Sequence, residues 1–142
     1  MPNIDKDILN GWDVVVIDDD PNSLTVASTV LAHYGASVHK ATNGQEGLDR
    51  VREVRPRFIV CDISMPVMDG WTFITEIKKL PVLQDIPVIA LTAHAMPGDR
   101  SKAIAAGFHN HMTKPLTPAT FMSDLLLLLE DIPETAQYLL KP

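Results

Sequence analysis

The feature that most constrains the fold is a run of apolar residues that stops at one carboxylate. Residues 58–61 (FIVC) have no polar side chain to face water, as in a strand buried on both faces of a sheet. Asp62 follows at once, and Pro66 and Asp69-Gly70, which are typical of turns, come shortly after it. This order places Asp62 on the rim of a sheet. A lone acid after a strand more often only opens a turn, so the rest of the chain has to decide its role.

Similar apolar runs recur along the chain and alternate with helical patterns. Strands are expected at 14–17, 36–41, 58–61, 87–91 and 108–113, and helices at about 21–34, 44–54, 71–80, 97–106 and 118–131. Strands that alternate with helices predict an α/β fold with a parallel sheet. For 142 residues the best match is a flavodoxin-like, doubly wound (βα)5 arrangement with strand order 2-1-3-4-5. We expect one domain at 12–132, with an N-terminal extension at 1–11 and a C-terminal tail at 133–142.

Composition excludes several classes of protein. The net charge of -6 disfavours general nucleic-acid binding, because phosphate backbones repel an acidic surface. The single cysteine, Cys61, lies inside an apolar run, which suggests a reducing compartment and leaves no pair for a disulfide or a zinc site. No signal peptide is recognisable at 1–10, and the leucine run 125–129 is too short to span a bilayer. We therefore expect a cytoplasmic protein that does not bind membranes.

Polar side chains follow four of the five expected strands. They are Asp18 and Asp19, Asp62, Thr92 and Lys114, after strands one, three, four and five. In a doubly wound sheet the functional crevice lies beyond the carboxyl ends of the strands, where the winding reverses. Three acids, a hydroxyl and an amine should therefore converge on one rim.

This set of groups suits phosphoryl chemistry with a divalent cation. Neighbouring carboxylates raise one another's pKa, and Mg²⁺, which prefers oxygen ligands, relieves the conflict. Three negative charges against two from Mg²⁺ and one from Lys114 leave a neutral site that can accept a dianionic phosphoryl group. Asp62 is the natural nucleophile, since carboxylates form acyl phosphates. The Thr92 hydroxyl could donate to a phosphoryl oxygen.

Four motifs carry a family resemblance. They are VVVIDDDP at 14–21, DISMPVMDG at 62–70, PVIALTA at 87–93 and TKP at 113–115. With these motifs in this order, each at a strand end, the chain resembles a response-regulator receiver domain of two-component signalling over residues 12–131. Any one motif is weak, whereas the ordered set is specific.

The resemblance implies a role for each rim residue. Asp62 would accept a phosphoryl group from a sensor histidine kinase or a phosphotransfer protein. Asp19, Asp62 and the backbone carbonyl of Ser64 would bind Mg²⁺, with Asp18 acting partly through water. Lys114, in a cis bond to Pro115, would contact the phosphoryl group, and Thr92 would start the conformational switch. Such a protein is a switch that assists its own phosphorylation and dephosphorylation rather than an enzyme acting on another substrate.

One position departs from the family pattern. His111 stands where receivers usually have Tyr or Phe as the partner of the switch threonine. The family also uses the fourth helix, fifth strand and fifth helix for partners or self-association. The fifth helix has a wide apolar arc, with a predicted core set of Phe121, Leu125, Leu128 and Ile132. Such an arc indicates deep burial or a protein contact.

Two other functions use related features. An aspartate-nucleophile phosphatase would need an Asp where Ser64 stands, and a flavin carrier would need a phosphate cradle where Asp18, Asp19 and Asp20 stand. His94, His109 and His111 do not complete a transition-metal site. Ser64 and His94 flank the expected path of the hydrolytic water, so we expect them to set the lifetime of the phosphoryl group. The chain could act alone, through protein contacts or in a relay, or as a module of a larger kinase.

Overall fold

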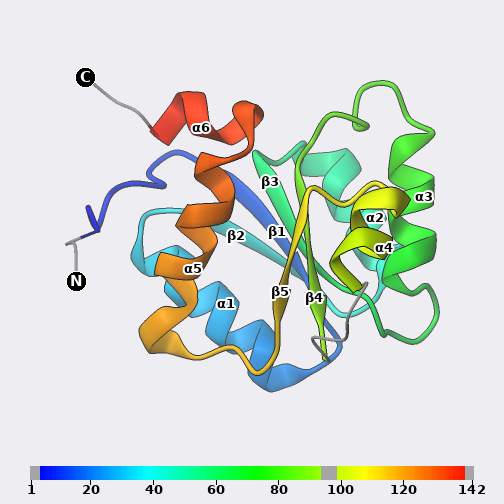
Figure 1. The fold of residues 1–142 in the computed structure, drawn as a ribbon, viewed down its shortest axis with the longest axis horizontal. Helices are drawn as coiled ribbons and strands as arrows, with labels where there is room; N and C mark the ends of the chain where they lie inside the picture. The colour runs from blue at the N-terminus through cyan, green and yellow to red at the C-terminus, as the bar shows by residue number, and fades with distance from the viewer. Residues whose placement is uncertain (1–3, 94–98, 140–142) are drawn as a thin grey trace.

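A computed structural model describes residues 4–93 and 99–139. Its strands are β1 (Asp13–Ile17), β2 (Ser37–Ala41), β3 (Phe58–Asp62), β4 (Val88–Thr92) and β5 (Asn110–Thr113). Its helices are α1 (Pro21–His33), α2 (Gly44–Val54), α3 (Gly70–Lys78), α4 (Asp99–Ala106), α5 (Pro118–Glu130) and α6 (Pro133–Leu139). Strands and helices alternate as far as α5, as the sequence predicted (Figure 1).

The strands form one parallel sheet in the order β2-β1-β3-β4-β5, which confirms the predicted flavodoxin-like topology. The register pairs Ile17 with Cys61 and Asp62 with Leu91, so the strand ends reach the same rim. β5 lies at an edge, as its polar sequence indicated. The parallel register therefore delivers the residues that follow each strand to one place.

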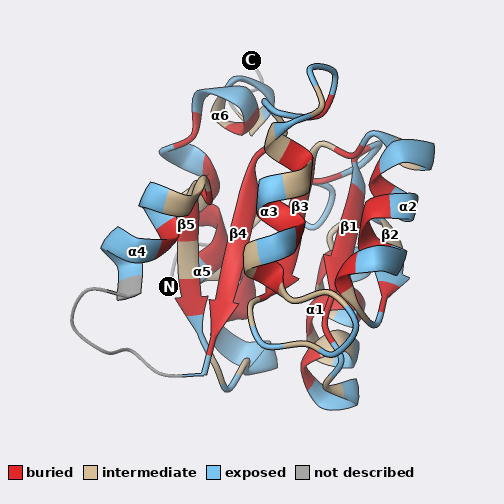
Figure 2. Cartoon of the chain, turned by 90° about the vertical axis from the view of Figure 1, so that its right-hand side faces the viewer, coloured by how far each residue is buried: buried red, intermediate tan, exposed pale blue. Residues whose placement is uncertain are grey.

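Helices cover both faces of the sheet. α1 and α5 pack on one face, and α2, α3 and α4 on the other (Figure 1). Strands β3 and β4 are buried along their whole length, which explains their continuous apolar sequence (Figure 2). Among the described residues, no helix has both the length and the apolar character needed to cross a membrane.

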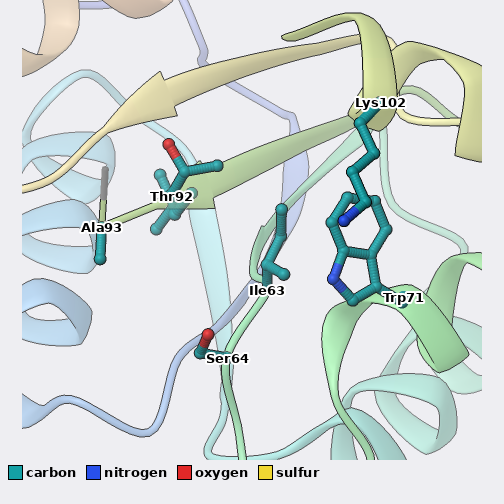
Figure 3. A pocket seen from close by; sticks show the side chains of 7 residues that line it. Ile63, Ser64, Trp71, Thr92, Ala93 and Lys102 are labelled. Atoms are coloured by element: carbon teal, nitrogen blue, oxygen red, sulfur yellow. The ribbon is translucent and has the colours of Figure 1, made fainter. Parts of the chain in front are cut away.

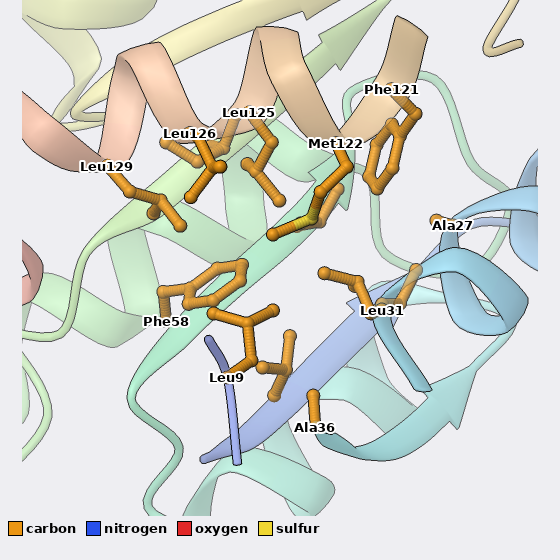
Figure 4. Packing of buried hydrophobic residues seen from close by; sticks show 14 of the residues in the cluster. Leu9, Ala27, Leu31, Ala36, Phe58, Phe121, Met122, Leu125, Leu126 and Leu129 are labelled. Carbon is orange, nitrogen blue, oxygen red and sulfur yellow. The ribbon is translucent and has the colours of Figure 1, made fainter. Parts of the chain in front are cut away.

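Burial accounts for most of the wide apolar arc of α5. Its inner face packs over Phe58, Leu9 and Leu31 in the cluster shown in Figure 4. The buried residues of this helix are Phe121, Met122, Leu125, Leu126 and Leu129. The predicted core set was wrong in one member, because Leu128 is only partly buried while Leu129 is fully buried. Of the leucines at 125–129, Leu127 is the exposed one, at 64%.

Several element boundaries differ from the prediction by one or two residues. β5 begins at Asn110 rather than Phe108, because the Phe108 amide still donates to the Ala103 carbonyl of α4, at 3.0 Å. The Phe108 side chain is buried against α3 and α4 instead of standing on a strand. The α3 helix ends at Lys78, two residues before its predicted end, and turns occupy the residues that follow.

The described segments that flank the sheet at both ends pack against the core of the domain. The described N-terminal residues form turns, and Leu9 is fully buried. The described part of the predicted C-terminal tail folds into α6 and packs back on the domain. The Thr135 hydroxyl donates to the Leu129 carbonyl oxygen, at 2.7 Å, and so ties α6 to the end of α5.

Candidate functional site

Three carboxylates meet where β1 and β3 end. Asp18 and Asp19 directly follow β1, and Asp62 is the last residue of β3. Each offers an oxygen that lies within 4.8 Å of those of the other two. The sequence predicted this convergence, and the parallel register of β1 and β3 produces it.

Lys114 reaches the same carboxylates from the neighbouring edge of the sheet. Its backbone amide donates to the Thr92 carbonyl at 2.8 Å, which continues the β4–β5 ladder by one residue. Its Nζ lies 3.0 Å from each Asp18 oxygen and 3.3 Å from Asp62 Oδ2. The Lys114–Pro115 peptide is cis, as the family resemblance implied.

Burial makes the charges in this cluster costly. Asp18 is fully buried and Asp62 is 5% exposed. Burial, together with the charge of Asp18, raises the pKa of Asp62 from 3.8 to about 7, although Lys114 opposes the rise. Burial acts to lower the pKa of Lys114, but the hydrogen bond and charge of Asp18 and the charge of Asp62 outweigh it and raise that pKa. Lys114 therefore stays positively charged, and its charge offsets only part of the cost of ionising Asp62.

Hydrogen bonds within the β1–α1 turn distinguish Asp20 from the two acids before it. Asp18 Oδ1 accepts from the Asp20 amide at 2.9 Å. The Asp20 side chain caps α1 instead, accepting from the Asn22 amide at 3.1 Å. The acidic cluster thus contains Asp18 and Asp19, while the Asp20 side chain caps the helix.

Two glycines hold the loop between Asp62 and α3. A Cβ at Gly70 would lie 2.6 Å from the Asp62 carbonyl oxygen, and one at Gly44 would lie 2.5 Å from the Met68 carbonyl oxygen. The Gly70 and Gly44 amides donate to the Ile63 and Met68 carbonyls, at 2.8 and 2.9 Å. No local pattern in the sequence predicts the hydrogen bond from Gly44 to Met68, because Gly44 lies far from the loop along the chain.

Thr92 ends β4 at the rim, and His111 lies further back on β5, where it pairs with Ala90. Thr92 is buried, and its hydroxyl is 3.5 Å from the Met112 carbonyl oxygen, a long contact. His111 is partly buried, and its Nδ1 has no hydrogen-bond partner in the described part of the chain. His109 instead accepts from the Val88 amide at 3.1 Å. Ser64 is exposed at the rim, and His94 lies outside the described residues.

Comparison with known proteins decides the family. A family model for the response regulator receiver domain matches residues 14–126. The chain belongs to this family. Receiver domains are signalling modules of two-component systems, and the acidic cluster lies where β1 and β3 end, within the first two of the four motifs.

Several relatives share this domain. A protein of Leptolyngbya boryana, described as an uncharacterized 14.6 kDa protein, is 39% identical over 75% of this chain and 81% of its own length. The sensor histidine kinase CheAY of Helicobacter pylori and the histidine-protein kinase BarA of Escherichia coli are each 35% identical over 72% of this chain. The matches span only 13% and 11% of those kinases.

Solved receiver structures have the same fold. The chemotaxis regulator CheY4 of Vibrio cholerae superposes with a TM-score of 0.77 and 26% identity, over 82% of this chain and 98% of that one. The receiver domain of a Pseudomonas aeruginosa sensor histidine kinase gives a TM-score of 0.73 and 29% identity, over 83% and 97%. That structure has a magnesium ion coordinated in its active-site cleft.

Proposed function

We propose that this receiver domain is a phosphorylation-activated switch that accepts a phosphoryl group on Asp62. The observation that carries the proposal is the position of the Asp62 carboxylate. It shares a rim with Asp18 and Asp19, all within 4.8 Å, and lies 3.3 Å from the Lys114 ammonium. A nucleophile beside a cation and spare carboxylates matches what phosphoryl transfer requires.

Mg²⁺ fits the donor set of this rim. Three carboxylates that share one lysine leave the cluster negative, and burial together with the charge of Asp18 raises the pKa of Asp62. Asp18, Asp19, Asp62 and the backbone carbonyl of Ser64 would hold the ion, and hard oxygen donors of this kind are those it prefers. When bound, Mg²⁺ would supply positive charge to the oxygens of the incoming phosphoryl group.

The chain's own residues divide the remaining work. An ionised oxygen of Asp62 attacks the phosphorus atom, the bond from phosphorus to the donor's leaving group breaks, and an acyl phosphate forms. Lys114, already at hydrogen-bond distance from both Asp18 and Asp62, holds a phosphoryl oxygen by charge. Thr92 has only the long contact to Met112 to give up when its hydroxyl turns to the new group.

We further propose that a sensor histidine kinase or a phosphotransfer protein supplies the phosphoryl group in the cytoplasm. Two histidine kinases among the relatives carry a similar segment, which supports this class of partner. Residues 12–132 would act as the receiver proper, flanked by the segments 1–11 and 133–142. Output would pass by protein contact or self-association through the surface of α4, β5 and α5, where Leu127 is exposed. The domain assists its own phosphorylation and dephosphorylation and acts on no other substrate.

The test is to record the intact mass of the protein after incubation with Mg²⁺ and acetyl phosphate. We expect a gain of one phosphoryl group in the wild type, and no gain with EDTA or in Asp62→Asn. Asp49→Asn is the matched control, because Asp49 is an exposed acid of α2, remote from the rim. A gain that persists in Asp62→Asn would contradict the proposal.

A further inference from the structure

A groove lies at the end of the sheet where β3 and β4 begin, opposite the rim that holds Asp62. The hollow between Ser64, Trp71 and Thr92 adjoins that rim and is part of its site (Figure 3). The groove at the other end has a volume of about 370 Å³ and is formed by the turn before β3, the turn before β4 and α6 (Figure 1). Because α6 lies outside the matched segment 14–126, family membership does not supply this groove.

The groove has a basic wall and an acidic wall. The basic wall is the turn before β3, with Arg55 and Arg57. The acidic wall carries Asp85, from the turn before β4, and Glu134, from the first turn of α6. Arg57 instead contacts Tyr138, near the last residue of α6, at 3.7 Å from its ring centroid. The two signs of charge are therefore separated along α6.

A second observation places the acidic wall at the end of α3. Burial lowers the pKa of Lys78, the last residue of α3, and the charges of Asp85 and Glu134 oppose that shift. Both acids therefore lie near Lys78. The Lys78 ammonium itself donates to the Gln84 carbonyl oxygen, at 2.8 Å.

The four charges of the groove make no ion pair with another described residue. Other exposed cations do pair, as Arg50 does with Glu53, at 3.6 Å. Arg55 also ends α2 in the left-handed conformation, with φ 51°, where glycine is the usual residue. Two large apolar side chains of the groove are exposed, Val82 at 67% and Tyr138 at 44%. Exposed tyrosine and arginine beside apolar surface are typical of protein interfaces.

We propose that a second copy of this chain packs on this groove through a twofold contact. A twofold axis between the two walls exchanges them, so the basic wall of one copy meets the acidic wall of the other, and each contact forms twice. The two positive and two negative charges sum to zero, so the groove adds no repulsion between copies that each carry a net charge of -6. A partner of a single sign, such as a nucleic acid, would match only one wall.

The contact leaves both phosphorylation rims open. Asp62 is the last residue of β3, whereas Arg57 directly precedes its first residue, so the groove and the rim lie at opposite ends of the sheet. Val82 and Tyr138 supply the apolar centre of the interface, and the charged walls surround it. Formation of the dimer therefore does not depend on phosphorylation.

The experiment measures the dimer by native mass spectrometry and sedimentation velocity over a concentration series. Arg55→Glu and Glu134→Arg should each raise the dissociation constant about tenfold, because each puts like charges opposite one another twice. An equimolar mixture of the two variants should form the heterodimer with a constant close to that of the wild type, since its contacts again join opposite charges. Arg50→Glu makes the same charge change at an exposed arginine outside the groove and should leave the dimer intact.

Several results would overturn the inference. One is a wild type that stays monomeric up to about 1 mM. Others are single variants that dimerise as well as the wild type, or a mixture that forms no more heterodimer than either variant forms homodimer. Loss of the dimer in Leu127→Asp but not in Arg55→Glu would place the contact on α5 instead. None of these results bears on Asp62, whose phosphorylation the acetyl phosphate experiment tests separately.

Discussion

Charged side chains have different surroundings at the two ends of the sheet. We call the end where the strands finish the carboxyl rim and the end where they begin the amino rim. At the carboxyl rim, Asp18 and Asp62 are buried together and share Lys114. At the amino rim, the Arg57 guanidinium contacts two aromatic rings, 5.2 Å from the centroid of Trp12 and 3.7 Å from that of Tyr138. One end packs like charges side by side, whereas at the other the cation contacts two aromatic rings, and the buried Nη1 of Arg57 has no hydrogen-bond partner among the described residues.

This contrast separates stability from function within one sheet. Segments far apart in sequence build the amino rim, because Tyr138 comes from α6 while Trp12 and Arg57 precede β1 and β3. Its contacts are apolar and aromatic, which favour folding. At the carboxyl rim the carboxylates have no aromatic contacts of this kind. Burial and the charge of Asp18 raise the pKa of Asp62, which means that its ionised form is unfavourable there. Removal of an aromatic side chain at the amino rim should therefore lower stability, and neutralisation of Asp62 at the carboxyl rim should raise it while abolishing phosphorylation.

The largest effect is expected at the amino rim. Trp12 is 3% exposed and packs edge-on against Phe58, with ring centroids 5.9 Å apart. Trp12→Ala should lower the free energy of unfolding by about 3 kcal/mol, because it leaves a cavity under α6. Urea denaturation measures this loss, and Trp12→Phe should recover part of it. If the folded Trp12→Ala protein were phosphorylated more than a few times slower than wild type, the two ends would not be independent.

An opposite and smaller effect is expected at the carboxyl rim. The pKa of Asp62 is about 7 in the folded protein and 3.8 ordinarily, so rising pH ionises the unfolded chain first. The metal-free protein therefore loses stability as the pH rises from about 4 to about 7. Asp62→Asn removes that loss and should stabilise the protein by on the order of 2 kcal/mol at pH 8, and by less at pH 5.

Urea denaturation in EDTA at the two pH values checks this prediction. Asp49→Asn, on the exposed face of α2, should change stability little at either pH. A destabilising effect of Asp62→Asn at pH 8 would show that the pairing with Lys114 outweighs the repulsion from Asp18.

The smallest effect expected is that of Mg²⁺ on the melting temperature. An ion that binds the folded state stabilises it by about 1.4 kcal/mol at ten times its Kd. The stabilisation should be larger at pH 8 than at pH 5, because protons compete for Asp62 below its raised pKa. Asp19→Asn should weaken it, whereas Asp85→Asn, an exposed acid near the amino rim, should not. An equal response in both variants would place the ion elsewhere.

Local sequence patterns were sufficient for the topology and for the composition of the rim. Continuous β-branched runs such as 14–17 identify buried strands, and a doubly wound parallel sheet then brings Asp18, Asp62 and Lys114 together. Patterns were weaker where tertiary contacts compete with local ones. Phe108 was predicted to start a strand, but its amide donates to the Ala103 carbonyl of α4. Leu128 was predicted to lie in the core, but Leu129 is the buried residue because it faces the sheet.

The sequence by itself determined the order of the elements and which chemical groups follow each strand, because side-chain periodicity and turn residues are properties of neighbouring residues. Only the tertiary structure decided the distances and the burial that set the pKa of Asp62. It also decided that Gly44 packs against the β3–α3 loop and that Arg57 contacts Trp12 and Tyr138. Each of these depends on segments remote in the chain meeting in space. No local pattern carries that information, because charge interactions and packing depend on separation in space rather than along the sequence.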